Sequence, residues 1–160
     1  MTMRMAVLVL LVAAVCCVNG STSRSELGAL KLLFWATEGA EWKNTWDVQN
    51  ERSDPCLHQW YGIICDGEDH IIAIRLSNNN LQGYLPKEFA RPALSYLREL
   101  DLSSNFLTGA VPSTLGMLSQ LHILRLDRNW FNGPFPSTLG SLMFLEYLYV
   151  SMRAHNASFV

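Results

Sequence analysis

The cysteines carry the clearest chemistry in this sequence. Cys56 and Cys65 are the pair that remains once an apolar N-terminal segment, residues 1–20, is set aside. An even pair of cysteines in a secreted chain indicates a disulfide, and the alternatives are two free thiols or part of a metal site. A zinc site needs further ligands at a recognisable spacing, and His58 and His70 do not complete one. We therefore predict a disulfide, with no metal and no cofactor, that stabilises the fold by about 2–3 kcal/mol.

Catalytic motifs do not occur in the sequence. There is no G-x-S-x-G, no H-E-x-x-H, no Walker-type phosphate loop and no dinucleotide fingerprint. The four histidines are scattered, with no evident cysteine or serine partner. The acidic stretch 66–69 lacks the ligand spacing of a calcium loop, so a turn between two strands explains it better. We predict that the chain is not an enzyme.

The N-terminal segment indicates the compartment. Arg4 precedes an apolar run over residues 5–18, and small polar residues follow from Asn19. This order predicts a signal peptide over residues 1–20. The alternative is a membrane anchor, but the run is shorter than the ~20 apolar residues that span a bilayer. We expect a secreted or cell-surface protein with no membrane span in the mature chain.

The charge balance excludes one class of partner. Lysines and arginines number 12 against 14 acidic residues, which gives a formal net charge of -2. Nucleic-acid binding requires a basic face that neutralises phosphates. We therefore expect no nucleic-acid partner.

An internal repeat organises the rest of the chain. Seven positions of the template L-x-x-L-x-L-x-x-N-x-L-x-G-x-x-P recur three times, with copies starting at residues 71, 97 and 121. The first copy consists of Ile71, Ile74, Leu76, Asn79, Leu81, Gly83 and Pro86. The second consists of Leu97, Leu100, Leu102, Asn105, Leu107, Gly109 and Pro112. The third consists of Leu121, Leu124, Leu126, Asn129, Phe131, Gly133 and Pro136. We assign three complete repeats to residues 71–144.

A fourth copy begins on the same period but departs from the template. It starts with Leu145, Leu148 and Val150. The template then requires Asn, an apolar residue and Gly, where the chain has Arg153, His155 and Ala157. We therefore assign residues 145–160 to an incomplete fourth repeat, whose apolar side would be exposed without a cover.

Each position of the template has a physical role. The alternating apolar residues face one side of a short strand. The Asn can pair backbone groups inside the turn, and the Gly permits a tight backbone path. Because one repeat cannot bury its own apolar face, the repeats must stack. This predicts an α/β-type solenoid, a right-handed arc with a short parallel concave sheet and a 3₁₀ or irregular convex side.

Residues 21–70 are expected to form an N-terminal cap over the first repeat. Ser23 and Glu26 have capping-box spacing, and apolar residues at helical spacing follow them. Trp35, Trp42 and Trp46 cluster after this helix and are expected to pack in the core, with carbohydrate stacking as the alternative. The predicted cap is thus helical and disulfide-bonded.

Together these motifs resemble a known family. The run Leu-x-x-Leu-Asp-Leu-Ser-x-Asn-x-Leu-x-Gly-x-x-Pro-x-x-Leu-Gly over residues 97–116 resembles the plant-type leucine-rich repeat. The D-P-C…W-x-G-I-x-C run over residues 54–65 resembles the paired-cysteine cap that precedes such repeats. The class includes receptor-like kinases, receptor-like proteins and polygalacturonase inhibitors. The resemblance implies an extracellular module that binds a protein, peptide or glycan on its concave face.

The repeat also predicts which side chains face the ligand. Outward positions align as the columns Ala73, Glu99, Ile123, Tyr147 and Arg75, Asp101, Arg125, Tyr149. Aromatic residues beside arginine are typical of binding surfaces, whereas alternating charges alone would indicate ion pairs on a solvated face. The ligand-binding candidates are Arg75, Glu99, Asp101, Arg125, Asp127, Arg128, Trp130, Tyr147 and Tyr149.

Three further expectations complete the sequence-based interpretation. Asn156 begins an Asn-Ala-Ser triplet, which is an acceptor for N-glycosylation. One alternative function is a non-catalytic fragment or structural surface protein with no ligand of its own. A second alternative, based on family analogy, is an inhibitor of a secreted hydrolase.

Overall fold

The computed structural model describes residues 22–90 and 92–152. The predicted signal peptide, residues 1–20, and the glycosylation acceptor Asn156 lie outside the described residues. So do Arg153, His155 and Ala157 of the fourth repeat. In the described part of the chain, no helix is both long and apolar enough to cross a membrane.

The cap, here residues 22–70, begins with helix α2, Arg24–Ala36. Its capping box is confirmed, because the Ser23 hydroxyl accepts the N–H of Glu26 while the Glu26 carboxylate accepts the N–H of Ser23. The helix buries one face that carries Leu30 and Leu33. A short 3₁₀ helix, η1, follows at Gly39–Glu41.

A cluster of aromatic rings fills the cap. Phe34 contacts Trp42 and Trp46 at ring-centroid distances of 5.3 and 6.4 Å, and Trp46 stacks on Trp60 at 5.2 Å. Trp42 and Trp46 are buried in the core, as predicted, and Trp60 is buried beside them. The expectation was wrong for Trp35, which is 60% exposed. Trp35 follows Phe34 by one helical position, so the turn of the helix directs it away from the core.

A hairpin connects the cap to the repeats. Strand β1, Ile63–Cys65, pairs antiparallel with β2, Ile71–Arg75. The acidic stretch 66–69 forms the turn between them, as predicted. The disulfide between Cys56 and Cys65 is also confirmed, with a Cα–Cα distance of 5.8 Å.

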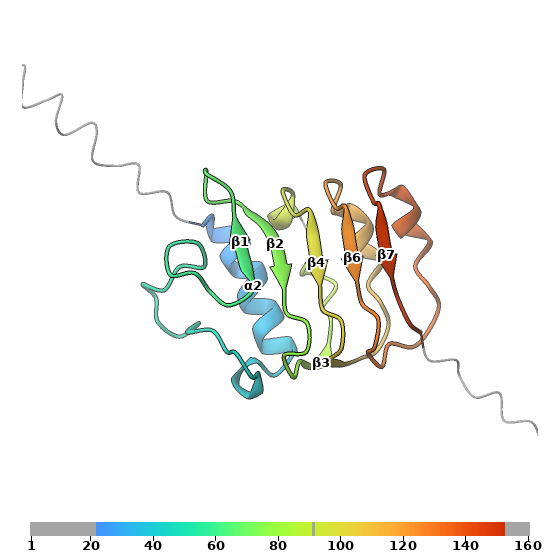
Figure 1. Ribbon diagram of the computed structural model, residues 1–160, viewed down its shortest axis with the longest axis horizontal. Helices are drawn as coiled ribbons and strands as arrows, with labels where there is room; N and C mark the ends of the chain where they lie inside the picture. The colour runs from blue at the N-terminus through green and yellow to red at the C-terminus, as the bar shows by residue number, and fades with distance from the viewer. Residues whose placement is uncertain (1–21, 91, 153–160) are drawn as a thin grey trace, which may run out of the picture.

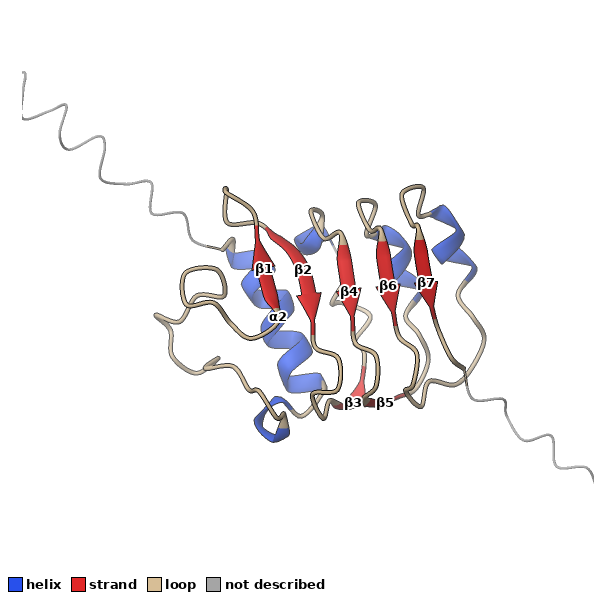
Figure 2. Cartoon of the chain, in the orientation of Figure 1, coloured by secondary structure: helices blue, strands red, loops and turns tan. Residues whose placement is uncertain are grey.

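Strands from successive repeats form one parallel sheet (Figures 1 and 2). Its strands β4, β6 and β7 are Glu99–Asp101, Ile123–Arg125 and Tyr147–Tyr149. The order is β1-β2-β4-β6-β7, with every pair from β2 onward parallel. The predicted parallel sheet is therefore confirmed, and its outward surface is called the concave face below.

The returning side of the coil is made of short elements. A second, two-stranded parallel sheet is formed by β3 and β5, Gln82–Tyr84 and Phe106–Thr108. The 3₁₀ helices η2, η3 and η4 are Pro92–Leu94, Ser113–Met117 and Ser137–Ser141. They lie behind the five-stranded sheet (Figure 2). This confirms the 3₁₀ convex side that the repeat predicted.

The apolar template positions form the core. The strand positions with 0% exposure are Ile71, Ile74, Leu76, Leu97, Leu100, Leu102, Leu121, Leu124 and Leu126. Convex-side leucines return to the same core, and these are Leu115, Leu118, Leu139 and Leu142. The stacked repeats therefore bury one continuous apolar interior.

The template Asn residues form a ladder of buried hydrogen bonds. The Oδ1 atom of Asn105 accepts the N–H groups of Asn79 and Leu81 at 2.9 and 3.0 Å. Its Nδ2 atom donates to the carbonyl of Leu76 at 2.8 Å. Asn129 forms equivalent bonds in the next repeat. These side chains satisfy backbone groups between adjacent turns, which is the role predicted for them.

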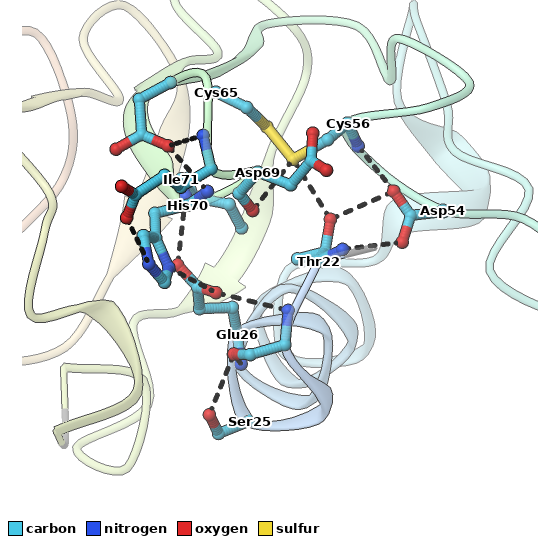
Figure 3. Close-up of polar contacts among 12 residues, drawn as sticks. Thr22, Ser25, Glu26, Asp54, Cys56, Cys65, Asp69, His70 and Ile71 are labelled. Carbon is cyan, nitrogen blue, oxygen red and sulfur yellow. Dashed lines mark hydrogen bonds and ion pairs between the residues drawn. A yellow bond between two sulfur atoms is a disulfide. The ribbon is translucent and has the colours of Figure 1, made fainter. Parts of the chain in front are cut away.

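Polar contacts tie the start of α2 to the first repeat (Figure 3). The backbone N–H and the hydroxyl of Thr22 donate to the Asp54 carboxylate at 2.9 and 3.0 Å. Asp54 also accepts the N–H of Cys56. The buried carboxylate of Glu26 accepts the N–H of Ile71 at 2.9 Å. Glu26, the second residue of the capping box, thereby holds the helix against the first strand of the repeats.

Candidate ligand-binding face

The register of the sheet aligns the outward residues as the repeat predicted. Ala73, Glu99, Ile123 and Tyr147 pair in sequence across β2, β4, β6 and β7. Arg75, Asp101, Arg125 and Tyr149 form the next column. Because side chains alternate along a strand, both columns face away from the core.

At the cap side of this face, Arg75 and Glu99 form a two-pronged ion pair. The Nε and Nη2 atoms of Arg75 donate to the two carboxylate oxygens of Glu99 at 2.9 and 2.6 Å. These hydrogen bonds raise the pKa of Arg75 above its ordinary value. Because the positive charge of Arg75 balances the negative charge of Glu99, the pair forms a nearly neutral polar patch.

In the middle of the face, Arg125 is oriented by two neighbours. Its Nη1 atom lies 4.0 Å from Oδ2 of Asp101, and its guanidinium carbon lies 5.0 Å from the ring centroid of Tyr149. Asp101 is only 9% exposed, and its other oxygen accepts the N–H and the hydroxyl of Ser103. The structure thus places Asp101 as a buried support for Arg125, which itself is exposed.

The far side of the face is aromatic. Tyr147 is 51% exposed and Tyr149 is 46% exposed. Below them, Asp127 and Arg128 approach each other, with a distance of 3.8 Å between Oδ2 and Nε. The N–H of Arg128 donates to the Ser151 hydroxyl at 2.9 Å, which joins this corner to the strand of the fourth repeat.

Trp130 lies away from the columns. It follows the ladder residue Asn129 and packs edge-on against Phe106 of β5, with ring centroids 5.5 Å apart. Its backbone N–H donates to the carbonyl of Leu107 in β5. Trp130 therefore belongs to the flank of the solenoid and not to the strands of the concave face.

The rim of the concave face carries residues that the sequence did not single out. Tyr96, Arg98, Gln120 and His122 lie in the segments that lead into β4 and β6. Arg98 and His122 occupy the same template position, the first variable residue of L-x-x-L, so a third column could have been read from the repeat. The contacts that this column makes with neighbouring turns could not be predicted from the sequence.

The geometry gives a surface suited to recognition. It offers exposed aromatic rings, an arginine placed over one of them, and the ion pair of Arg75 with Glu99. Among residues 22–90 and 92–152, no group of three or more His, Cys, Asp or Glu is placed to hold a metal ion.

Comparison with known proteins agrees with this arrangement. The family model described as Leucine Rich Repeat matches residues 70–91, 96–118 and 120–142. A probable leucine-rich repeat receptor-like protein kinase of Arabidopsis thaliana is 37% identical over 100 residues, which are 61% of this chain and 10% of that protein. The chain spans about a tenth of the length of the curated relatives it matches.

Two solved structures are also similar to this chain in sequence and in fold. The crystal structure of PEPR1-AtPEP1 matches with 32% identity and a TM-score of 0.70, covering 80% of this chain and 18% of that one. The BIR3 - SERK2 complex from Arabidopsis thaliana matches with 26% identity and a TM-score of 0.66, covering 76% of this chain and 65% of that one. Both similarities extend over the cap and the repeats.

Proposed function

Because the chain is built of leucine-rich repeats like those of extracellular plant receptor domains, we propose that it recognises a peptide or protein ligand on its concave face. The observation that carries this proposal is the position of Arg125 over the exposed ring of Tyr149, on a strand that also exposes Tyr147. Tyr and Arg are enriched among the residues that dominate binding energy at protein interfaces.

The arrangement supports recognition without catalysis. Arg125 is held between Asp101 and Tyr149, so its guanidinium needs little ordering when a ligand arrives. The two tyrosines supply large amphipathic contact areas. Two of the similar structures, PEPR1-AtPEP1 and BIR3 - SERK2, are themselves complexes, which favours a protein or peptide partner.

A display library of random linear peptides, screened against the secreted chain, tests the proposal. Selected peptides should bind with a Kd that rises about thirtyfold in Tyr149→Ala, the loss of about 2 kcal/mol expected for a central contact. Tyr84→Ala is the matched control, because Tyr84 is 60% exposed but lies on β3 of the second sheet. Equal losses in the two variants, or no saturable binder, would contradict a concave-face site.

A further inference from the structure

A cavity with both polar and apolar lining opens at the rim of the concave face, outside the columns proposed above for the peptide ligand. Its volume is about 510 Å³, which is within the usual range for small-ligand sites. The lining residues are Ser95, Tyr96, Arg98, Ser119 and Gln120. They come from the two loops that precede β4 and β6, so adjacent repeats build the cavity together. None of the lining side chains is acidic.

The ring of Tyr96 forms one wall of the cavity, and His70 packs against this ring. Tyr96 stacks on His70 with ring centroids 3.9 Å apart and planes 12° from parallel, yet it remains 47% exposed. His70 in turn lies between Glu26 of α2 and Glu68 of the hairpin turn, at 3.7 and 3.8 Å (Figure 3). The ring is therefore ordered before any ligand binds.

The positive charge of the cavity is available to a ligand. Arg98 is fixed through its backbone, which donates to the carbonyl of Ile72 and accepts the N–H of His122. Within the described part of the chain, its guanidinium forms no hydrogen bond or ion pair. The concave-face arginines differ in this respect, because each lies within 4.0 Å of a carboxylate oxygen.

Two acidic groups of the hairpin turn, Asp66 and Glu68, are engaged by other residues. The Asp66 carboxylate accepts the backbone N–H groups of His70 and Glu68 at 3.0 Å. The bond from His70 is the main reason that the pKa of Asp66 lies below its ordinary value, and the charge of Arg98 adds to the effect from a distance. Glu68 faces His70. Both carboxylates therefore have partners other than Arg98.

We propose that this cavity binds one uronic acid residue of an acidic oligosaccharide. The carboxylate of the sugar pairs with the guanidinium of Arg98. The sugar hydroxyls bond the side chains of Ser95, Ser119 and Gln120, and the apolar face of the ring packs on Tyr96. A uronic acid can engage all five lining residues, whereas an acidic peptide side chain would engage Arg98 alone, so the sugar fits the cavity better.

The full secreted chain is titrated with sodium glucuronate, with glucose and with glutarate, and amide NMR shifts report binding. Glucuronate should move the signals of Ser95 and Ser119 and should bind more tightly than either control ligand. Arg98→Gln should weaken glucuronate binding about tenfold, the usual effect of losing one charged hydrogen bond. Arg52→Gln, a surface arginine of the cap outside the cavity, is the matched control and should bind as the wild type does.

Several outcomes would overturn the proposal. Equal binding of glucose would show that the carboxylate is not recognised, and equal binding of glutarate would show an anion site without sugar recognition. Shifts confined to other residues would place the ligand elsewhere. An unchanged unfolding midpoint in Arg98→Gln excludes misfolding as the cause of a loss, and Ser119→Ala should give a smaller loss in the same direction. The peptide proposal stands or falls separately with Tyr149.

Discussion

The first and last parallel strands of the five-stranded sheet, β2 and β7, place the same repeat position in different environments. At β2, the hairpin strand β1 pairs with the edge, and Ile74 is fully buried. At β7, the last strand of the sheet among the described residues, the equivalent Leu148 is 42% exposed. An apolar residue of this coil is therefore buried by the adjacent repeat and not by its own repeat.

The cap end also has more kinds of contact. It combines a disulfide, a capping box and a buried carboxylate that spans the junction. The β7 end is held to β6 by the backbone ladder and to Arg128 by Ser151. The stability of the two ends should therefore respond differently to equivalent changes, and three experiments test this difference.

The largest effect is expected from the repeat leucines. Leu100→Ala removes a fully buried side chain between two strands and should lower the free energy of unfolding by about 3 kcal/mol. Leu148→Ala, the same change at the same template position, should cost about 1 kcal/mol or less because the side chain is already partly hydrated. Urea denaturation followed by circular dichroism measures both. Equal losses would show that Leu148 is covered in solution.

The disulfide should act on the cap end alone. Replacing Cys56 and Cys65 by serine removes a short covalent loop and should lower stability by about 2–3 kcal/mol. Hydrogen exchange should accelerate in β1 and β2 while β6 and β7 keep their protection, since each repeat contacts only its neighbours. Uniform loss of protection along the sheet would instead show that the whole coil unfolds as one unit.

The smallest effect concerns the helix start. Ser23→Ala removes the hydroxyl that accepts the N–H of Glu26 and should cost about 1 kcal/mol. Ser23→Gly should cost only a few tenths of a kcal/mol, because Gly tolerates the capping conformation. Thermal unfolding compares the two variants. A larger loss in the Gly variant than in the Ala variant would contradict the assignment of Ser23 as the N-cap.

Much of the fold was predictable from the sequence because the repeat is periodic. The spacing of Leu97, Leu100 and Leu102 is enough to indicate which side chains point inward. The same spacing predicted the columns of the concave face, and the even cysteine pair predicted the disulfide. The error at Trp35 arose because clustering in sequence does not show on which side of a helix a residue lies.

The details of the surface were not predictable in this way. Asp101 and Arg125 occupy equivalent positions in the sequence, yet one is buried and the other is exposed. Trp130 was grouped with the concave tyrosines but joins Phe106 on the flank. Side-chain direction there depends on neighbours from other turns, which are about 24 residues away in sequence.

The coil, its cap, its disulfide and the alignment of outward residues were predictable from the sequence, because these follow from periodicity and from short spacings. The pairing of the charged side chains became visible in the three-dimensional structure alone. The stack of His70 on Tyr96 and the cavity that contains Arg98 exist because adjacent turns bring their loops together. Contacts between turns require the strand register and the side-chain rotamers, and a one-dimensional pattern contains neither.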